Sequence, residues 1–142
     1  MSTENWRIKC EILEILRVFF INQAYLSDGV LKVFFGLTDD KIDAVRLKAN
    51  ELIVEIIAKS SKEWCDQYVI PKISGMKDSA TYIKRQNILD LIERTAPHVS
   101  EKALKEHYHN VVATFLGDKV PNVRLKGVMV IKNNNKLLNS VI

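Results

Sequence analysis

The sequence has 142 residues, 47% of them apolar and 27% charged, a composition typical of one soluble folded domain and not of a disordered chain. Its formal net charge of +4 comes from basic residues scattered among 17 acidic ones, so a nucleic-acid partner is not expected. No run of about 18 apolar residues occurs and the N-terminus is polar, so the sequence predicts neither a membrane span nor a signal peptide.

The first half of the chain predicts two long helices with the same spacing of apolar residues. From residue 8, and again from residue 45, apolar residues recur so that six of them fall on one stripe of a helix. They are Ile8, Ile12, Ile15, Leu16, Phe19 and Phe20, and then Val45, Ala49, Leu52, Ile53, Ile56 and Ile57. Between these helices, residues 24–38 predict a shorter one that is apolar nearly all round in its second half.

The second half of the chain predicts four more helices. Ser60 and Glu63 have the spacing of a capping box, and the helix after them contains Pro71, which is expected to kink it. Residues 81–96 predict a long helix whose pattern fits if the turn at Ser79 holds one extra residue. A helix capped by Ser100 and a last helix, with Pro121 in its first turn and the pattern broken at Asn133, complete the set.

Two turns of the sequence resemble each other closely. Asp40 and Asp118 are each followed five places later by a β-branched residue and six places later by an arginine, Arg46 or Arg124. Fainter copies of the pattern occur at Asp78 and around Trp6, so that the helix anchors Ile8, Val45, Ile83 and Val123 recur every 37 to 40 residues. A period of this length is typical of a helical solenoid.

We therefore predict an all-α fold, a right-handed α-solenoid of about three and a half helical hairpins in a single domain, residues 1–142. Its units are a half repeat in residues 1–22 and hairpins in residues 23–60, 61–97 and 98–142. Neither end carries the polar face of a capping repeat: Phe19 and Phe20, and then Val128, Met129 and Val130, are candidates for exposed apolar surface. The chain is thus expected to be a fragment of a longer array.

For several charged residues of the turns, a structural role is the simplest explanation. We expect the basic residues at the starts of the long helices to pair with turn aspartates of adjacent units. The residues in this predicted series of ion pairs are Asp40, Arg46, Asp78, Lys84, Asp118 and Arg124.

The repeat resembles the HEAT repeat, and in more detail the C-terminal third of the scaffold (A) subunit of type 2A serine/threonine protein phosphatase. The segments that carry this resemblance are Trp6 to Lys9, Lys62 to Trp64, Val69 to Lys72, Tyr82 to Arg85 and Asp118 to Arg124. The resemblance implies a non-catalytic scaffold without a cofactor, whose turns bind the phosphatase catalytic subunit. Carried over by position, the partner-binding residues would be Trp6, Arg7, Tyr82, Val120 and Asn122. A regulatory subunit would bind through N-terminal repeats that this sequence lacks.

Two other classes of helical-repeat protein stay open. A transport or assembly adaptor would bind its partner on the concave face of the long helices, with Lys48, Glu51, Glu55, Lys59 and Asp90 as candidate contacts. A DNA-repair protein of the same fold would need an exposed basic and aromatic cleft, and its affinity for DNA would fall steeply with salt.

The sequence gives little support for a catalytic or a metal-binding site. The three histidines are His98, His107 and His109, and the last two point to different sides of a helix because they are two residues apart. No nucleophile motif or glycine-rich phosphate loop occurs, so we predict no enzyme, no metal site and no cofactor. Cys10 and Cys65 lie in separate apolar stretches and are expected to be buried thiols in the cytoplasm, with the nucleus as a further compartment.

Overall fold

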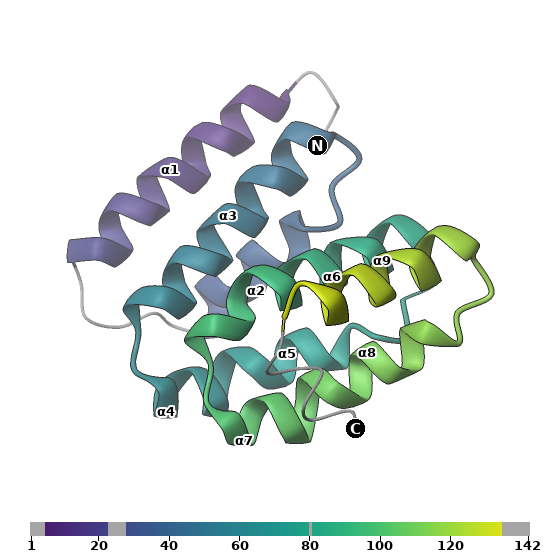
Figure 1. Ribbon diagram of the computed structural model, residues 1–142. Helices are drawn as coiled ribbons and strands as arrows, with labels where there is room; N and C mark the ends of the chain where they lie inside the picture. Colours follow the sequence, from purple (N-terminus) through teal and green to yellow (C-terminus); the bar gives the residue numbers. More distant parts are fainter. Residues whose placement is uncertain (1–4, 23–27, 80, 135–142) are drawn as a thin grey trace. The chain divides into compact units, whose positions relative to one another are not determined.

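The computed structural model describes residues 5–22, 28–79 and 81–134, and within these ranges it is all-α, with seven helices and no strand (Figure 1). None of the described helices is long and apolar enough to cross a membrane. The chain divides into two compact units, Met1–Ile56 and Ile57–Ile142. The all-α prediction is confirmed, whereas the stacking of hairpins into a solenoid stays a prediction.

The first unit is built from three helices, the last of which continues past the division. They are α1 (Trp6–Asn22), α2 (Asp28–Leu37) and α3 (Asp43–Lys59). Helices α1 and α3 lie side by side and run in the same direction (Figure 1). Their polar contacts advance together along both helices, from Glu14–Lys48 at 2.7 Å to Arg17–Glu55 at 2.6 Å.

Helix α2 packs Phe34 against α3. Phe34 is fully buried and lines a shallow depression together with Leu52 and Ile56 of α3. The acidic Asp43 in the first turn of α3 and the basic Lys59 in its last turn both suit the helix dipole. Helix α3 therefore contacts α2 through apolar side chains and α1 through ion pairs.

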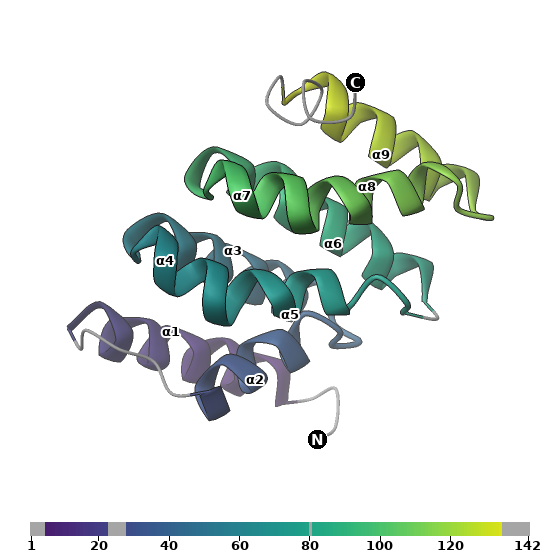
Figure 2. The same cartoon turned by 90° about the horizontal axis from the view of Figure 1, so that it is seen from below.

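The second unit contains two helices with π-helical segments and two regular long helices. The first composite helix is α4 (Lys62–Trp64), η2 (Cys65–Val69) and α5 (Ile70–Gly75), and the second is α7 (Glu101–Ala103), η4 (Leu104–Tyr108) and α8 (His109–Leu116). The long helices are α6 (Tyr82–Thr95) and α9 (Pro121–Lys132), and a short 3-10 turn, η3 (Ala96–His98), follows α6. Figure 2 shows α5 and α8 in one layer and α6 and α9 in the other.

The two composite helices begin in the same way. The hydroxyl oxygen of Ser61 accepts a hydrogen bond from the Trp64 amide at 3.2 Å, and that of Ser100 accepts one from the Ala103 amide at 3.0 Å. Each cap is followed by a five-residue π segment, and the two caps are 39 residues apart. The predicted capping box at Ser60 is wrong, because the cap lies one residue later, where the side chain reaches the third amide of the helix.

Pro71 lies just after the first π segment, at the start of α5. Proline has no amide hydrogen and crowds the preceding turn, so a change of helical hydrogen bonding next to it is physically reasonable. The amide of Ile70 accordingly donates to the carbonyl of Cys65, five residues back. However, the second π segment has no proline after it, so Pro71 alone does not explain the pattern.

The turns before α3, α6 and α9 share one arrangement of hydrogen bonds. Arg46, Arg85 and Arg124 each donate from Nη1 to a backbone carbonyl six residues earlier, at 2.7, 2.9 and 2.6 Å. The acceptors are Asp40, Ser79 and Asp118, so donors and acceptors both recur at 39 residues.

This regular interval corrects the predicted register of the middle turn. The amides of Asp40, Ser79 and Asp118 all donate to the carbonyl three residues earlier, and the turns are equally long. The expected extra residue at Ser79 is therefore wrong. The position equivalent to Asp40 is occupied by Ser79 and not by Asp78, and the equivalent basic residue is Arg85 and not Lys84.

The core of the second unit contains a fully buried tyrosine. Tyr108 is 0% exposed, and its hydroxyl lies 2.6 Å from the hydroxyl of Thr95, which donates to the Leu91 carbonyl at 2.6 Å. Burial raises the pKa of Tyr108 above its ordinary value, so the phenol stays neutral. This polar pair ties η4 to the end of α6 inside an otherwise apolar core.

The predicted apolar ends of the chain are only partly exposed. Val128 and Met129 are 54% and 46% exposed, whereas Val130 is fully buried. The side chains of Phe19 and Phe20 lie outside the described residues. Helix α1 differs from expectation, because Ile8 and Ile15 are 53% and 66% exposed while the residues of α3 at the same pattern positions are buried.

Candidate partner-binding turns

The turn before α9 is held against α6 by a buried ion pair. Arg85 donates from Nε and Nη2 to the two carboxylate oxygens of Asp118, at 2.7 and 3.1 Å, and both side chains are less than a tenth exposed. Asp118 also accepts from the amide of Val120 at 2.8 Å. This geometry places the N-terminal ends of α6 and α9 next to each other at one edge of the second unit.

Three of the predicted partner-binding residues lie at this edge. Tyr82 is the first residue of α6 and is 47% exposed, and Asn122 is exposed in the first turn of α9. Val120 is half-buried and forms the N-cap of α9, with an extended backbone. Pro121 begins α9 at a position where its missing amide is not needed. The edge thus combines an exposed aromatic ring with a helix that begins at a proline.

The other two predicted partner-binding residues lie at the start of α1, in the first unit. Trp6 is half-buried, and the guanidinium carbon of Arg7 lies 5.2 Å from the centre of its ring. At this distance the cation interacts favourably with the face of the indole. Arg7 is exposed, so this pair can contact a partner, or it can simply cover the start of the helix.

The turn before α3 repeats the arrangement of Asp118 with a lysine in place of Arg85. Lys9 donates from Nζ to Asp40 at 2.5 Å, and the amide of Ile42 donates to the same carboxylate at 2.9 Å. Burial would raise the pKa of Asp40, but the hydrogen bonds from Lys9 and from Ile42 outweigh it and hold the pKa below its ordinary value. The turn aspartate is therefore ionised at neutral pH.

The same balance operates at Asp118. Burial would raise its pKa, and the hydrogen bonds from the Val120 amide and from Arg85 lower it by more. In each unit an ionised aspartate thus receives its own turn amide and a cation from the preceding long helix. We call these two arrangements the aspartate turns.

The predicted series of ion pairs differs from the contacts that the structure places there. Arg46 and Arg124 contact carbonyls of their own turns, and Arg46 also pairs with Asp43 at 3.0 Å, so neither reaches an aspartate of an adjacent turn. Asp78 is exposed and Lys84 is half-buried. Within each unit, the cations that link one long helix to the next turn are Lys9 and Arg85.

Arg85 was missed because the apolar anchor of α6 was placed on Ile83. The interval of 39 residues from Arg46 to Arg85 and on to Arg124 was present in the sequence. A search for recurring basic residues, in place of recurring apolar ones, would have identified Arg85 as the repeated residue.

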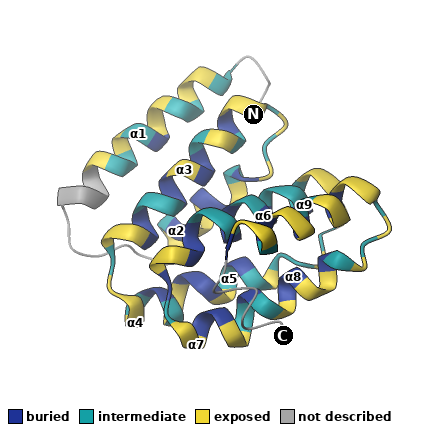
Figure 3. Ribbon diagram, in the orientation of Figure 1, coloured by how far each residue is buried: buried dark blue, intermediate teal, exposed yellow. Residues whose placement is uncertain are grey.

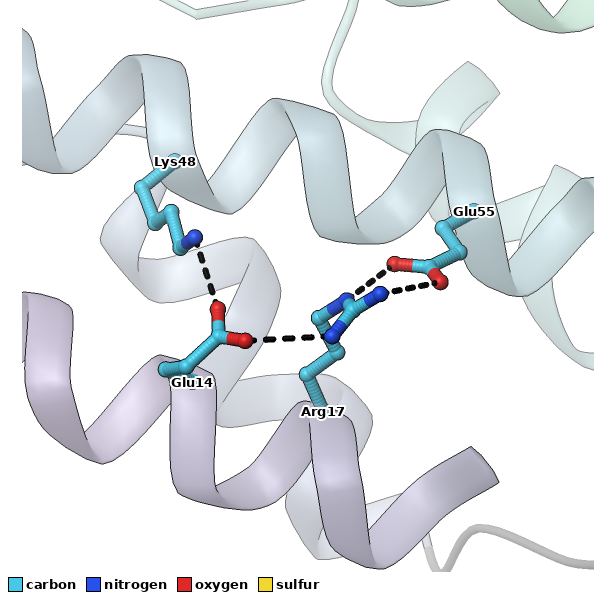
Figure 4. Close-up of polar contacts among 4 residues, drawn as sticks. All are labelled: Glu14, Arg17, Lys48 and Glu55. Atoms are coloured by element: carbon cyan, nitrogen blue, oxygen red, sulfur yellow. Dashed lines mark hydrogen bonds and ion pairs between the residues drawn. The ribbon is translucent and has the colours of Figure 1, made fainter. Parts of the chain in front are cut away.

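A second group of charges joins α1 to α3 away from the turns (Figure 4). Glu14 accepts from Lys48 at 2.7 Å and from Arg17 at 3.1 Å, and Arg17 continues to both carboxylate oxygens of Glu55 at 2.6 and 3.1 Å. The hydrogen bond from Lys48 is the largest influence on Glu14 and lowers its pKa. Lys48 and Glu55, two candidates for a concave binding face, are thus engaged within the first unit.

A comparable group joins α6 to α9 in the second unit. Lys126 lies 3.2 Å from Glu93 and 3.8 Å from Asp90, and Asp90 also lies 3.8 Å from Arg94. Asp90, a third candidate for a concave binding face, therefore takes part in contacts between neighbouring helices. Glu51 is exposed, and so is Lys59.

Potential metal ligands do not gather in the part of the chain that the structure describes. No group of three or more potential ligands is close enough there to hold a metal ion. His107 lies 3.3 Å from the hydroxyl of Ser74, which also contacts the Pro71 carbonyl. Both cysteines are free thiols, and burial raises the pKa of Cys65 to about 11, so that it is a poor nucleophile.

No family model matches the chain, and no curated protein matches it either.

Proposed function

We propose that this chain is a non-catalytic scaffold of the HEAT type, whose hairpins stack as a right-handed solenoid and whose turns bind a protein partner. The observation that carries the proposal is the edge of the second unit, where exposed Tyr82 lies beside the aspartate turn of α9. Aromatic side chains on a rigid support are frequent anchors of protein interfaces. The 39-residue recurrence of the turn hydrogen bonds further supports a repeat protein.

For the partner, we propose the catalytic subunit of a type 2A serine/threonine protein phosphatase. The resemblance of the Trp6, Tyr82 and Asp118 segments to the phosphatase scaffold supports this choice. Tyr82 would anchor the partner, and Val120 and Asn122 would contact it alongside. In the first unit, Trp6 and Arg7 would contribute a second contact.

The test is the affinity of the purified chain for the isolated phosphatase catalytic subunit, measured by calorimetry. Tyr82→Ala should weaken binding by about 30-fold, the loss typical of an interface anchor worth about 2 kcal/mol. Tyr68→Ala is the matched control, because Tyr68 is a comparably exposed tyrosine of the same unit, 44% against 47%, and packs on Trp64 with ring centres 5.8 Å apart.

Two results would contradict the proposal. If the wild-type chain does not bind the catalytic subunit, the choice of partner is wrong. If binding occurs and Tyr68→Ala weakens it as much as Tyr82→Ala, the turn edge is not the binding surface.

A further inference from the structure

Helix α9 has an exposed apolar face. Leu125, Val128 and Met129 are 60%, 54% and 46% exposed, and their spacing of three and four residues places them on one side of the helix. Figure 3 shows exposed positions recurring along α9. Lys132, in the last turn of α9, is exposed next to them. Three exposed apolar side chains on one side of a helix form a surface that water solvates poorly.

Helix α1 has an exposed apolar face as well. Ile8, Ile12 and Ile15 are 53%, 39% and 66% exposed, and their spacing of four and three residues places them on one stripe. Glu11 is exposed on the same side of α1, between the isoleucines. This face therefore combines an apolar stripe with an anion.

In the second unit, the face of α6 that corresponds to the exposed face of α9 is buried. Leu89 of α6, the residue 39 positions before Val128, is fully buried. Four residues further along α6, Glu93 pairs with Lys126 of α9 at 3.2 Å, and Lys132 is the residue 39 positions after Glu93. The exposed face of α9 thus corresponds to the face of α6 that packs on the next long helix.

The long helix that follows carries a lysine at the position that pairs with an acid of the preceding long helix. Lys126 of α9 receives Glu93, and in the first unit Lys48 of α3 receives Glu14 at 2.7 Å. Glu11 occupies the corresponding position in α1, because the apolar patterns of α1 and α3 superimpose at an interval of 37 residues. The pair formed by Glu93 of α6 and Lys126 of α9 is therefore replaced by a base, Lys132, and an acid, Glu11.

We propose that the chain associates with a second copy of itself head to tail, with α9 of one copy lying parallel to α1 of the next. Lys132 pairs with Glu11 of the second copy, and Val128 and Met129 cover the isoleucine stripe around Ile15. The reversal of both charges preserves attraction at the position where Glu93 and Lys126 attract each other. This inference does not depend on the phosphatase partner.

The proposed interface is heterologous, since it joins two different faces. Each added copy leaves one α9 face and one α1 face available, so growth continues beyond a dimer unless a ring closes. The average mass of the wild-type protein should accordingly rise with concentration past that of two chains. Salt should reduce the association, because both charged residues are exposed.

The test is sedimentation velocity of the full chain over a range of concentrations. Lys132→Glu and Glu11→Lys should each raise the dissociation constant at least about tenfold, because each places like charges together. An equimolar mixture of the two variants should associate again, because every α9–α1 contact between the different variants is then of opposite charge. The double variant carrying both substitutions should associate like the wild type.

An apolar substitution tests the same interface without charge. Val128→Gln should weaken the association, and Val33→Gln is the matched control, because Val33 of α2 is similarly exposed at 47%. Circular dichroism of each variant should show unchanged helix content, since all four positions are on the surface.

Four results would overturn the proposal. The first is a wild-type chain that stays monomeric at every concentration, and the second is a mixture of the charge variants that does not associate. The third is a dimer insensitive to Lys132→Glu and Val128→Gln, which would indicate symmetric pairing of two α1 helices. The fourth is an equal effect of Val33→Gln and Val128→Gln, which would indicate non-specific association.

Discussion

Arg85 and Asp118 are 33 residues apart in the sequence and form two hydrogen bonds at 2.7 and 3.1 Å, with 7% and 8% of their side chains exposed. Arg85 also donates to the Ser79 carbonyl, and Asp118 receives the Val120 amide. One arginine therefore joins its own turn to the next one. A buried pair of this kind is costly to break, because the remaining partner stays desolvated and charged.

We expect Arg85→Ala to destabilise the second unit by about 3–5 kcal/mol, the cost of leaving a buried carboxylate without its cation. The measurement is urea unfolding followed by the fluorescence of Trp64, in a Trp6→Phe background so that only the second unit reports. The chain has two tryptophans, one in each unit, which makes this separation possible.

Arg124→Ala is the control for this experiment. Arg124 makes the same contact with a carbonyl six residues earlier, but it is exposed. Its loss should cost only about 1 kcal/mol, the net value of an ordinary hydrogen bond. Equal losses of unfolding free energy for the two substitutions would mean that the buried ion pair stabilises the unit no more than an ordinary hydrogen bond does.

The aspartate turn makes the stability of the second unit depend on pH. Because the pKa of Asp118 is lower in the folded state than in the unfolded state, the unfolded chain takes up a proton more readily as the pH falls. The stabilisation is complete above the unfolded pKa of about 3.9 and is lost as the pH falls through the lower folded value. Acid should therefore weaken the unit.

We expect Asp118→Asn to remove this part of the pH dependence. The difference in unfolding free energy between wild type and Asp118→Asn should be largest near neutral pH and should shrink between about pH 4 and pH 2. Asp78→Asn, at an exposed aspartate before α6, should parallel the wild type. A difference that stays constant down to the lowest pH would show that Asp118 does not act through its charge.

The sequence predicted the long helices well and the register of one turn poorly. The stripes starting at Ile8 and Val45 identified α1 and α3, because apolar residues at helical spacing are a strong local signal. The anchor on Ile83 was wrong by one residue, because Ile83 is 41% exposed and does not belong to the buried stripe of α6. Composition alone cannot separate an exposed isoleucine from a buried one.

The contacts of the candidate site were less predictable than its elements. Tyr82 and Asn122 are exposed, and their role in binding stays a prediction. The apolar pattern around α6 did not reveal which cation binds Asp118. Which of two neighbouring basic residues, Lys84 or Arg85, faces the next turn depends on the rotation of α6. Tertiary packing sets this rotation, and a change of one residue turns the side chain by about 100° around the helix.

Tyr108 provides a test of the polar pair in the core of the second unit. Because the Thr95 hydroxyl donates to the Leu91 carbonyl, the Tyr108 hydroxyl is the donor in the pair with Thr95. Tyr108→Phe should cost about 1 kcal/mol, since it removes one hydrogen bond and leaves Thr95 with its bond to Leu91. Tyr108→Ala should cost about 3–5 kcal/mol, because it also opens a cavity.

The measurement for Tyr108 is again urea unfolding reported by Trp64. Tyr68→Phe is the control, because Tyr68 is 44% exposed and its hydroxyl has access to water. A loss near 3 kcal/mol for Tyr108→Phe would indicate that the hydroxyl has a larger role than one hydrogen bond. No loss at all would indicate that the pair with Thr95 does not form in solution.

Two glycines within helices should respond in opposite ways to substitution by alanine. A Cβ added at Gly36, near the end of α2, would meet no atom within 4 Å, and no described residue has a positive φ. Gly36→Ala should therefore stabilise the first unit by about 0.5–1 kcal/mol, since alanine loses less backbone entropy on folding.

A Cβ at buried Gly127 of α9 would lie 3.2 Å from Cδ2 of Leu116, so Gly127→Ala should yield no gain in stability unless α8 and α9 separate slightly. Trp6 fluorescence in a Trp64→Phe background measures the first effect, and Trp64 fluorescence in a Trp6→Phe background measures the second. A gain at Gly127 equal to that at Gly36 would show that α8 and α9 are packed less closely than the structure indicates.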